Sequence, residues 1–271
     1  GSIFQKGTTV VNCTATDASG NTAFCSFTVT VIDNQPPAIT CPANLTVNTA
    51  PGTCDAIANF VATATDNCPG VNISYSHPSG STFQKGTTVV TATATDAAGL
   101  TAFCSFTVTV IDNQPPAITC PANLTVNTAP GVCEAVVTFA ATASDNCPGV
   151  TISYSQNPGT IFPKGTTVVM ANATAAAGNT ASCSFTVTVI DAEPPKIGVQ
   201  ASSQTVECDG AGNVAALNVW LASNGGAQAS DACGTVKWSN NFTSLSDLCG
   251  ATGSATVTFT ATDECGNTST T

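Results

Sequence analysis

A ten-residue segment, DNQPPAITCP, occurs twice without change, first at Asp33 and again at Asp112, 79 residues later. A divergent copy that begins DAEPP starts at Asp191, after another 79 residues. Self-similarity at a fixed period means that the chain is built from units that fold alike. We therefore divide it into an incomplete repeat, two complete repeats and a divergent last repeat: 1–32, 33–111, 112–190 and 191–271.

Both ends of the chain fall inside repeats. Gly1 aligns with Gly80, midway through a repeat, and Thr271 precedes any counterpart of the CSFTVTV segment that ends the earlier repeats. An incomplete sandwich exposes unpaired strand edges, which are templates for pairing with another strand. We expect either that the sequence is a window onto a longer polymer or that another chain completes its ends.

Apolar residues alternate with Thr and Ser along each repeat. One parity of the CSFTVTV segment holds only apolar residues: Cys104, Phe106, Val108 and Val110. A period of two is the signature of a half-buried strand. Turn residues separate such segments, at 49–52, 66–70 and 96–99. About seven short strands in about 80 residues are typical of an immunoglobulin-like domain.

The pattern therefore predicts an all-β chain of tandem immunoglobulin-like β-sandwich modules. Two adjacent prolines stand at each repeat boundary, as in Pro36-Pro37. Because proline fixes φ and restricts the residue before it, we expect a semi-rigid, extended array.

The last repeat carries one departure from the strand pattern. Between Asn213 and Ser223, four apolar residues recur at helical spacing: Val214, Leu217, Trp220 and Leu221. Asn213 is suited to the N-cap position, and Gly225-Gly226 can end a helix. We expect one short helix packed on an otherwise all-β module.

Charge and composition exclude several classes of function. Sixteen acidic residues face five basic ones, all lysine, and the net charge of −11 disfavours nucleic acid as a partner. No apolar run reaches about 18 residues, so no membrane span is expected. Fourteen cysteines argue for an oxidising, extracellular or cell-surface location. With His77 as the single histidine, neither a zinc site nor an enzyme with a Cys–His nucleophile is favoured.

Three motifs resemble the hyalin-repeat (HYR) domain: PPAITCPANLTVNTAPG, FQKGTTVV and ATDxxGxTxxCSFTVTV. The last repeat, through TVECDG, SDACG and TATDECGNTST, is similar to a relative found beside such repeats in large surface proteins of Bacteroidota. The resemblance implies an immunoglobulin-like fold, an extracellular role in adhesion and no catalytic residues. It also suggests kinship with gliding-motility adhesins. Two departures are Cys13, where later repeats have alanine, and Ala175 in place of Asp96.

Four cysteines in each complete repeat allow three connectivities. Strand parity points Cys41 and Cys104 inward on the strands that begin and end the module, so we expect these two to pair. The corresponding bridge in the next repeat is Cys120–Cys183. The remaining cysteines then give Cys54–Cys68 and Cys133–Cys147.

The end repeats are treated separately. Topology places Cys233 and Cys265 at one end of the last module, which leaves Cys208–Cys249. Cys13 and Cys25 flank a turn at Ser19-Gly20 and are predicted to pair across a hairpin. Alternatively, Cys25 could bond a cysteine upstream of this sequence.

Asp33, Asp66 and Asp96 are expected near the incoming end of repeat 33–111. Converging carboxylates could bind Ca²⁺, a hard cation that takes oxygen ligands. The alternative is that each aspartate caps its own turn. No other cofactor is expected.

The favoured functional hypothesis is a structural stalk or filament segment of a large repetitive adhesin. Its partners would be neighbouring modules or copies of the same protein. The alternatives are a filament subunit completed by strand exchange, and a module that binds glycans, other surfaces or protein ligands through its loops.

Overall fold

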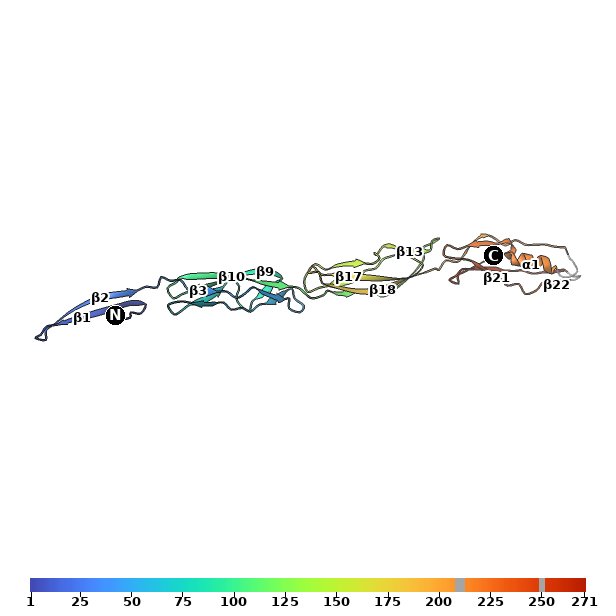
Figure 1. The fold of residues 1–271 in the computed structure, drawn as a ribbon. Helices are drawn as coiled ribbons and strands as arrows, with labels where there is room; N and C mark the ends of the chain where they lie inside the picture. The colour runs from blue at the N-terminus through green and yellow to red at the C-terminus, as the bar shows by residue number, and fades with distance from the viewer. Residues whose placement is uncertain (208–212, 249–251) are drawn as a thin grey trace. The chain divides into compact units, whose positions relative to one another are not determined.

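The computed structural model describes residues 1–207, 213–248 and 252–271. In these residues the chain is almost entirely β, as predicted, with one α-helix (Figure 1). It divides into two compact units. The first contains Gly1–Pro116, Asp145–Val150 and Ala175–Asn179, and the second contains Ala117–Ser144, Thr151–Thr174 and Thr180–Thr271.

The first unit begins with an antiparallel hairpin of β1 (Gly7–Thr16) and β2 (Thr22–Val31). Asp17 shapes the turn between them, because its Oδ1 accepts hydrogen bonds from the backbone N–H groups of Ser19 and Asn21, both at 2.9 Å. The hairpin forms a two-stranded sheet of its own.

Repeat 33–111 is a sandwich built from eight strand segments: β3 (Ala38–Thr40), β4 (Leu45–Asn48), β5 (Asp55–Ile57), β6 (Thr63–Thr65), β7 (Asn72–Tyr75), β8 (Thr82–Gln84), β9 (Gly86–Thr95) and β10 (Thr101–Ile111). One sheet has the order β4-β10-β9-β7, and the opposite layer consists of the pairs β3-β6 and β5-β8. The strand β4 runs parallel to β10.

The alternating residues of β9 and β10 form the core of this sandwich, as their period predicts. Val90, Phe106 and Val108 are buried against Phe83 from the opposite layer. Phe60 lies between the layers, with its ring centroid 4.9 Å from Phe106 and in edge-to-face geometry.

Repeat 112–190 reproduces this arrangement with β11 (Ala117–Thr119), β12 (Leu124–Asn127), β13 (Glu134–Val137), β14 (Thr142–Ser144), β15 (Thr151–Tyr154), β16 (Thr160–Pro163), β17 (Gly165–Thr174) and β18 (Thr180–Ile190). Its larger sheet has the order β12-β18-β17-β15. Phe139 takes the place of Phe60, with its ring centroid 4.9 Å from Phe185. The prediction of tandem immunoglobulin-like sandwiches is confirmed.

The last repeat contains the helix α1 (Val214–Ala222), followed by the short 3₁₀ turn η1 (Asn224–Gly226). Its strands are β19 (Lys196–Val199), β20 (Gln228–Ser230), β21 (Lys237–Asn240), β22 (Ser246–Leu248), β23 (Thr252–Ser254), β24 (Phe259–Thr262) and β25 (Thr268–Thr270). Among the described residues, no helix is both long and apolar enough to cross a membrane.

The predicted helix is confirmed, but its expected cap is not. Asn213 precedes the helix with a φ of 54°, and its side chain makes no capping hydrogen bond. A capping side chain needs extended backbone at that position. Its Nδ2 instead donates to the Glu207 carbonyl. The helix is fixed by Trp220, whose ring packs 5.1 Å from Phe259 and whose Nε1 donates to the Ser202 carbonyl.

Candidate functional site

The cysteines within each sandwich follow strand parity. Cys41 is bonded to Cys104 and Cys120 to Cys183, with Cα atoms 5.8 and 5.9 Å apart. In each case the bond joins the end of the first strand to the last strand, which is the pairing expected from the sequence.

The turn cysteines pair differently from the prediction. Cys54 is bonded to Cys147 and Cys133 to Cys233, so the predicted pairs Cys54–Cys68 and Cys133–Cys147 are wrong. The reason is positional. The turn that holds Cys54 contacts the outgoing linker, where Gly52 N–H donates to the Gln114 side chain, whereas Cys68 lies beside Asp33 in the incoming linker. The two cysteines of one repeat therefore lie at opposite ends of its sandwich.

Three further cysteine predictions have different outcomes. The predicted pair Cys233–Cys265 is wrong, because Cys233 is bonded to Cys133 and Cys265 has a free thiol. Cys13 and Cys25 face each other in the hairpin register, but both thiols are free, so the predicted bridge is not formed. The pair Cys208–Cys249 lies outside the described residues.

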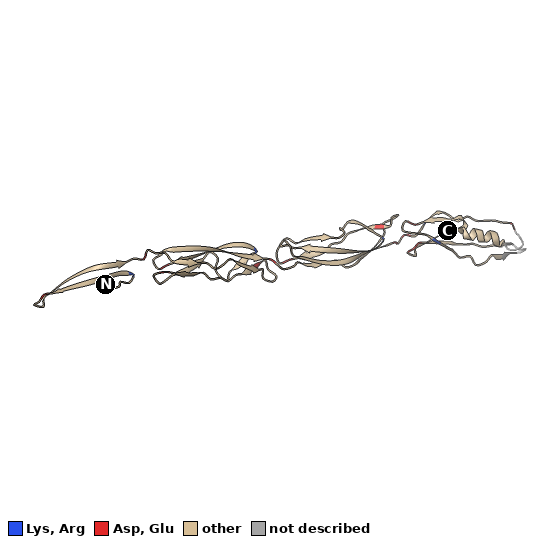
Figure 2. Cartoon of the chain, viewed as in Figure 1, with Lys and Arg blue, Asp and Glu red and all other residues tan. Residues whose placement is uncertain are grey.

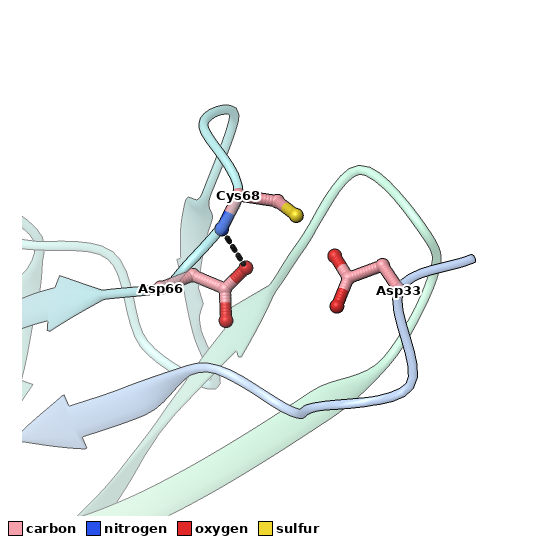
Figure 3. Close-up of side chains that lie close together, drawn as sticks. All are labelled: Asp33, Asp66 and Cys68. Atoms are coloured by element: carbon pink, nitrogen blue, oxygen red, sulfur yellow. Dashed lines mark hydrogen bonds between the residues drawn. The ribbon is translucent and has the colours of Figure 1, made fainter. Parts of the chain in front are cut away.

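Figure 3 shows the side chains that meet at the start of repeat 33–111: Asp33, Asp66 and Cys68. One atom from each of these side chains lies within 4.8 Å of the others. Asp66 Oδ2 accepts a hydrogen bond of 3.0 Å from the Cys68 N–H, and Asp33 Oδ1 accepts one of 3.3 Å from the Gln35 N–H. Each carboxylate therefore caps a turn, as the alternative to calcium binding predicts.

Lys6 supplies the positive charge of this cluster, since its Nζ donates to Asp33 Oδ2 at 3.1 Å. This bond lowers the pKa of Asp33 and raises the pKa of Lys6. A side-chain hydrogen bond to Asp33 in turn raises the pKa of the Cys68 thiol. The thiol stays protonated near neutral pH, which makes it a poor nucleophile and a poor metal ligand in this state.

Asp96 is not part of the cluster formed by Asp33, Asp66 and Cys68. Its Oδ1 caps the β9–β10 turn by accepting from the N–H groups of Ala98 and Leu100, both at 2.8 Å. Asp66 Oδ1 and Asp96 Oδ2 are buried without a hydrogen-bond partner. The structure thus brings together two of the three predicted calcium ligands and leaves buried oxygens on two of the three aspartates.

The boundary after repeat 33–111 contains a lysine–aspartate pair that corresponds to Lys6 and Asp33. The Nζ atom of Lys85 lies 3.8 Å from Oδ2 of Asp112. Asn146, next to the bonded Cys147, donates from Nδ2 to Thr49 Oγ1 at 3.2 Å and to the Thr53 carbonyl at 2.8 Å. The Cys54–Cys147 bond is therefore accompanied by side-chain hydrogen bonds that cross the same boundary.

The boundary after repeat 112–190 has contacts of the same kind, made in part by different residue types. Lys164 donates from Nζ to the Cys233 carbonyl at 2.9 Å, and Glu193 accepts from the Gly131 N–H at 2.7 Å. Asp191 and Asp231 approach the bonded Cys233, as Asp33 and Asp66 approach Cys68. Sequence reasoning missed the three lysines, although Lys6, Lys85 and Lys164 recur at the 79-residue period and would have been found by aligning the basic residues.

The family model described as "HYR domain" matches residues 1–31, 32–110 and 111–189. Hyalin of Lytechinus variegatus is 35% identical over 285 residues, covering 98% of this chain and 52% of the relative. Hyalin of Strongylocentrotus purpuratus is 32% identical over 280 residues, covering 98% of this chain and 23% of the relative. The chain thus spans about half the length of the first relative and less of the second.

Among solved structures, a titin I67–I69 variant aligns with a TM-score of 0.36 at 11% identity, covering 87% of this chain and 96% of that chain. The family assignment rests on the HYR model, whose three matches together run from residue 1 to residue 189. The chain belongs to the HYR domain family.

Proposed function

We propose that the chain is a structural segment of an extracellular, adhesion-type repeat protein, in which it acts as a disulfide-stabilised stalk and not as an enzyme. The observation that carries this proposal is the bridge between consecutive repeats, present as Cys54–Cys147 and again as Cys133–Cys233. These bridges join one module to the next, which is what an array that carries load along its length requires.

The bridges inside each repeat support a mechanical role. Tension on repeat 33–111 enters at Asp33 and leaves at Asp112. Only 8 residues separate Asp33 from Cys41, and another 8 separate Cys104 from Asp112. The Cys41–Cys104 bond therefore carries the applied force past the chain segment between its two cysteines, whose sequence separation is 63. A repeat of this kind keeps its length when it is pulled.

Location and partners follow from the same chemistry. Disulfides persist in oxidising compartments, which supports an extracellular or cell-surface site. The partners proposed here are neighbouring repeats or further copies of the same protein. The kinship with Bacteroidota adhesins stays a prediction.

Single-molecule pulling on the full chain tests the stalk proposal. The Cys41–Cys104 bond keeps the chain between these two cysteines, at a sequence separation of 63, from extending. At about 3.3–3.6 Å per extended residue, this segment has a length of about 200 Å. Unfolding steps of the complete repeats should lengthen by about that amount when a reductant is added. Step lengths that are the same with and without reductant would contradict the proposal.

Calcium binding at the start of repeat 33–111 is a second candidate function, through Asp33 and Asp66, while Asp96, the third predicted ligand, lies outside their cluster. Its support is the buried, unpartnered Asp66 Oδ1, since Ca²⁺ is bound by carboxylate oxygens. The Lys6 ammonium competes with the cation for Asp33.

A calorimetric CaCl₂ titration of the chain and of its Asp66→Asn variant tests this second function. The binding heat should be lost in the variant. A melting temperature that calcium leaves unchanged in both proteins would remove the proposal. The equivalent of Asp96 in the next repeat is Ala175, which provides an internal comparison.

The two alternatives to a stalk are assembly by strand exchange and ligand binding by loops. Strand exchange would join copies of the chain through unpaired strand edges. Native mass distinguishes it, because self-assembly requires species larger than the 26.9 kDa chain. A glycan array on which the chain shows no signal above background would remove the second alternative.

A further inference from the structure

Three cysteines meet at the boundary after repeat 112–190. Cys133 and Cys233 are bonded to each other, and Cys265 is exposed with a free thiol. Lys164 contacts all three of them. Its backbone N–H donates to the Cys133 carbonyl at 3.0 Å. Its Nζ donates to the Cys233 carbonyl at 2.9 Å and to Cys265 Sγ at 3.6 Å. One lysine therefore places a free thiol beside a disulfide.

The turn that holds Cys265 is tied to the loop that holds Cys233. Glu264, the neighbour of Cys265, accepts a hydrogen bond of 2.9 Å from Thr235 Oγ1 and one of 3.4 Å from the Thr235 N–H. Both segments belong to repeat 191–271, whereas the other cysteine of the bridge belongs to the repeat before it. The free thiol is thus held on the Cys233 side of the bridge.

The boundary after repeat 33–111 has the same bridge without the third cysteine. Lys85 donates from its backbone N–H to the Cys54 carbonyl at 3.1 Å, as Lys164 does at the later boundary. Ala177 stands in the place of Cys265, since each of them directly precedes a Gly-Asn pair in the same turn. The cysteine beside the later bridge is therefore an addition to the repeat pattern.

The free thiol is not left over from the bridge within a sandwich. That bridge joins the first strand to the last strand in the two complete repeats. In repeat 191–271 its two positions are occupied by Val199 and Thr271, so this repeat has no cysteine at either of them. Cys265 therefore has a place of its own, in the turn that faces the preceding repeat.

We propose that Cys265 is a resolving thiol, which opens the covalent link between the last two repeats by disulfide exchange. It bonds Cys233 in place of Cys133, so that a bridge between two repeats becomes a bridge within the last one. The bond between Cys133 and Cys233 is the starting state of this exchange. The inference rests on the proposed stalk function and deepens it, because it makes one boundary of the stalk releasable and leaves the earlier boundary locked.

The exchange is balanced without an oxidant or a reductant. Cys265 loses its proton to solvent, and its sulfur forms a bond to the sulfur of Cys233. The bond from Cys233 to Cys133 breaks, and its electron pair passes to the sulfur of Cys133, which takes up a proton. The attacking form of a cysteine is the thiolate. The Lys164 ammonium lies 3.6 Å from the sulfur on which that negative charge develops.

The test follows the oxidised full chain over time at about pH 8, where cysteine thiols ionise in part. No thiol and no disulfide is added. Samples are acidified to stop the exchange, alkylated with N-ethylmaleimide at mildly acidic pH and digested with pepsin, so that each bridge keeps its partners. Mass spectrometry of the peptides then identifies every bond. The matched control is Cys265→Ser, which keeps the other free thiols, Cys13, Cys25 and Cys68.

In the parent chain, the peptide that joins Cys233 to Cys265 should appear with time. Cys133 should gain the alkyl label in the same amount as Cys265 loses it. In the Cys265→Ser variant, Cys133 should stay bonded and unlabelled. The peptide that joins Cys54 to Cys147 should be unchanged in both proteins, because the equivalent boundary has no third cysteine.

Three outcomes would overturn the inference. One is labelling of Cys133 that does not rise with time in the parent chain, and another is an equal rise in the Cys265→Ser variant. The third is a peptide that joins Cys133 to Cys265, since the two repeats would then stay linked. The same digest reports on the stalk function. If both bridges between repeats are present and persist, only the exchange inference fails; if both are absent from the oxidised chain, the proposed function fails.

Discussion

Cys147 is bonded to Cys54 across the boundary between two repeats, with their Cα atoms 4.7 Å apart and a sequence separation of 93. Cys147 is buried, at 1% exposure, while its partner Cys54 is half-buried. It is also placed by polar contacts, because the neighbouring Asn146 donates hydrogen bonds to Thr49 and Thr53 of the preceding repeat. The bond is therefore part of a packed boundary.

Replacing Cys147 with serine should destabilise this boundary. The change removes a crosslink over a long loop and leaves a buried hydroxyl, so we expect a loss of about 2–5 kcal/mol in the free energy of unfolding. Urea unfolding of the oxidised protein measures the loss. Alkylation before and after the change should detect one more free thiol, that of Cys54.

Cys13→Ser is the matched control, because Cys13 is exposed and free. It should leave the urea midpoint unchanged and remove one alkylated thiol. If Cys147→Ser behaves in the same way as Cys13→Ser, the bridge between the repeats does not form in solution.

The outcome for the cysteines shows what sequence can and cannot supply. Cys41 and Cys104 were paired correctly because both lie on or next to strands, where a period of two fixes which side chains face inward. Cys54 and Cys68 lie in turns, which have no such period. Their true partners depend on which loops of consecutive repeats meet, and no local pattern encodes that.

The carboxylate cluster shows the same limit. The sequence placed Asp33 and Asp66 at one end of the module correctly, because strand direction determines the end at which each turn lies. Asp96 failed to join them because its side chain is used within its own turn. Lys6 belongs to no strand or turn pattern, and only its recurrence at Lys85 and Lys164 marks it.

Phe60 should be among the most sensitive core positions of repeat 33–111. Its ring lies 4.9 Å from Phe106, 5.3 Å from Tyr75 and 6.1 Å from Phe83, all in edge-to-face geometry. Phe60→Ala leaves a cavity that these three rings cannot fill, so we expect a loss of about 3–5 kcal/mol. Calorimetric melting of the oxidised chain measures it.

Phe103→Ala is the control for this prediction, because Phe103 is 78% exposed on the outer face of β10. Its melting curve should match that of the parent chain. Equal shifts for both variants would mean that Phe60 does not organise the core.

Asp96→Ala should weaken the β9–β10 turn without unfolding it. The carboxylate accepts two backbone N–H groups, whose loss should cost about 1–2 kcal/mol. The turn itself should persist, because Ala175 occupies the same position in the next repeat and keeps the same backbone bonds to Asn179 and Gly178. Amide hydrogen exchange at Ala98 and Leu100 should become faster in the variant, while exchange at Gly178 should not change.

The pair of Lys6 and Asp33 should make the hairpin's attachment to repeat 33–111 depend on pH. Lys6 lowers the pKa of Asp33, so this contribution is present above the ordinary aspartate pKa of about 3.9 and is lost as the pH falls through the lowered value. The pKa of Lys6 is raised, so the same contribution is lost again as the pH rises past the ordinary lysine value of about 10.4 and through the raised one.

Lys6→Met separates this interaction from the other titrating groups. NMR titration of the Asp33 carboxyl carbon should show a higher pKa in the variant than in the parent chain. The difference in melting temperature between the two proteins should be present at about pH 7 and should shrink as the pH falls through the lowered pKa of Asp33. Asp17 serves as the reference, because its pKa is lowered by hydrogen bonds from Asn21, which the substitution does not touch. If the pKa of Asp33 is the same in both proteins, the 3.1 Å contact between Lys6 and Asp33 does not hold the hairpin to the repeat.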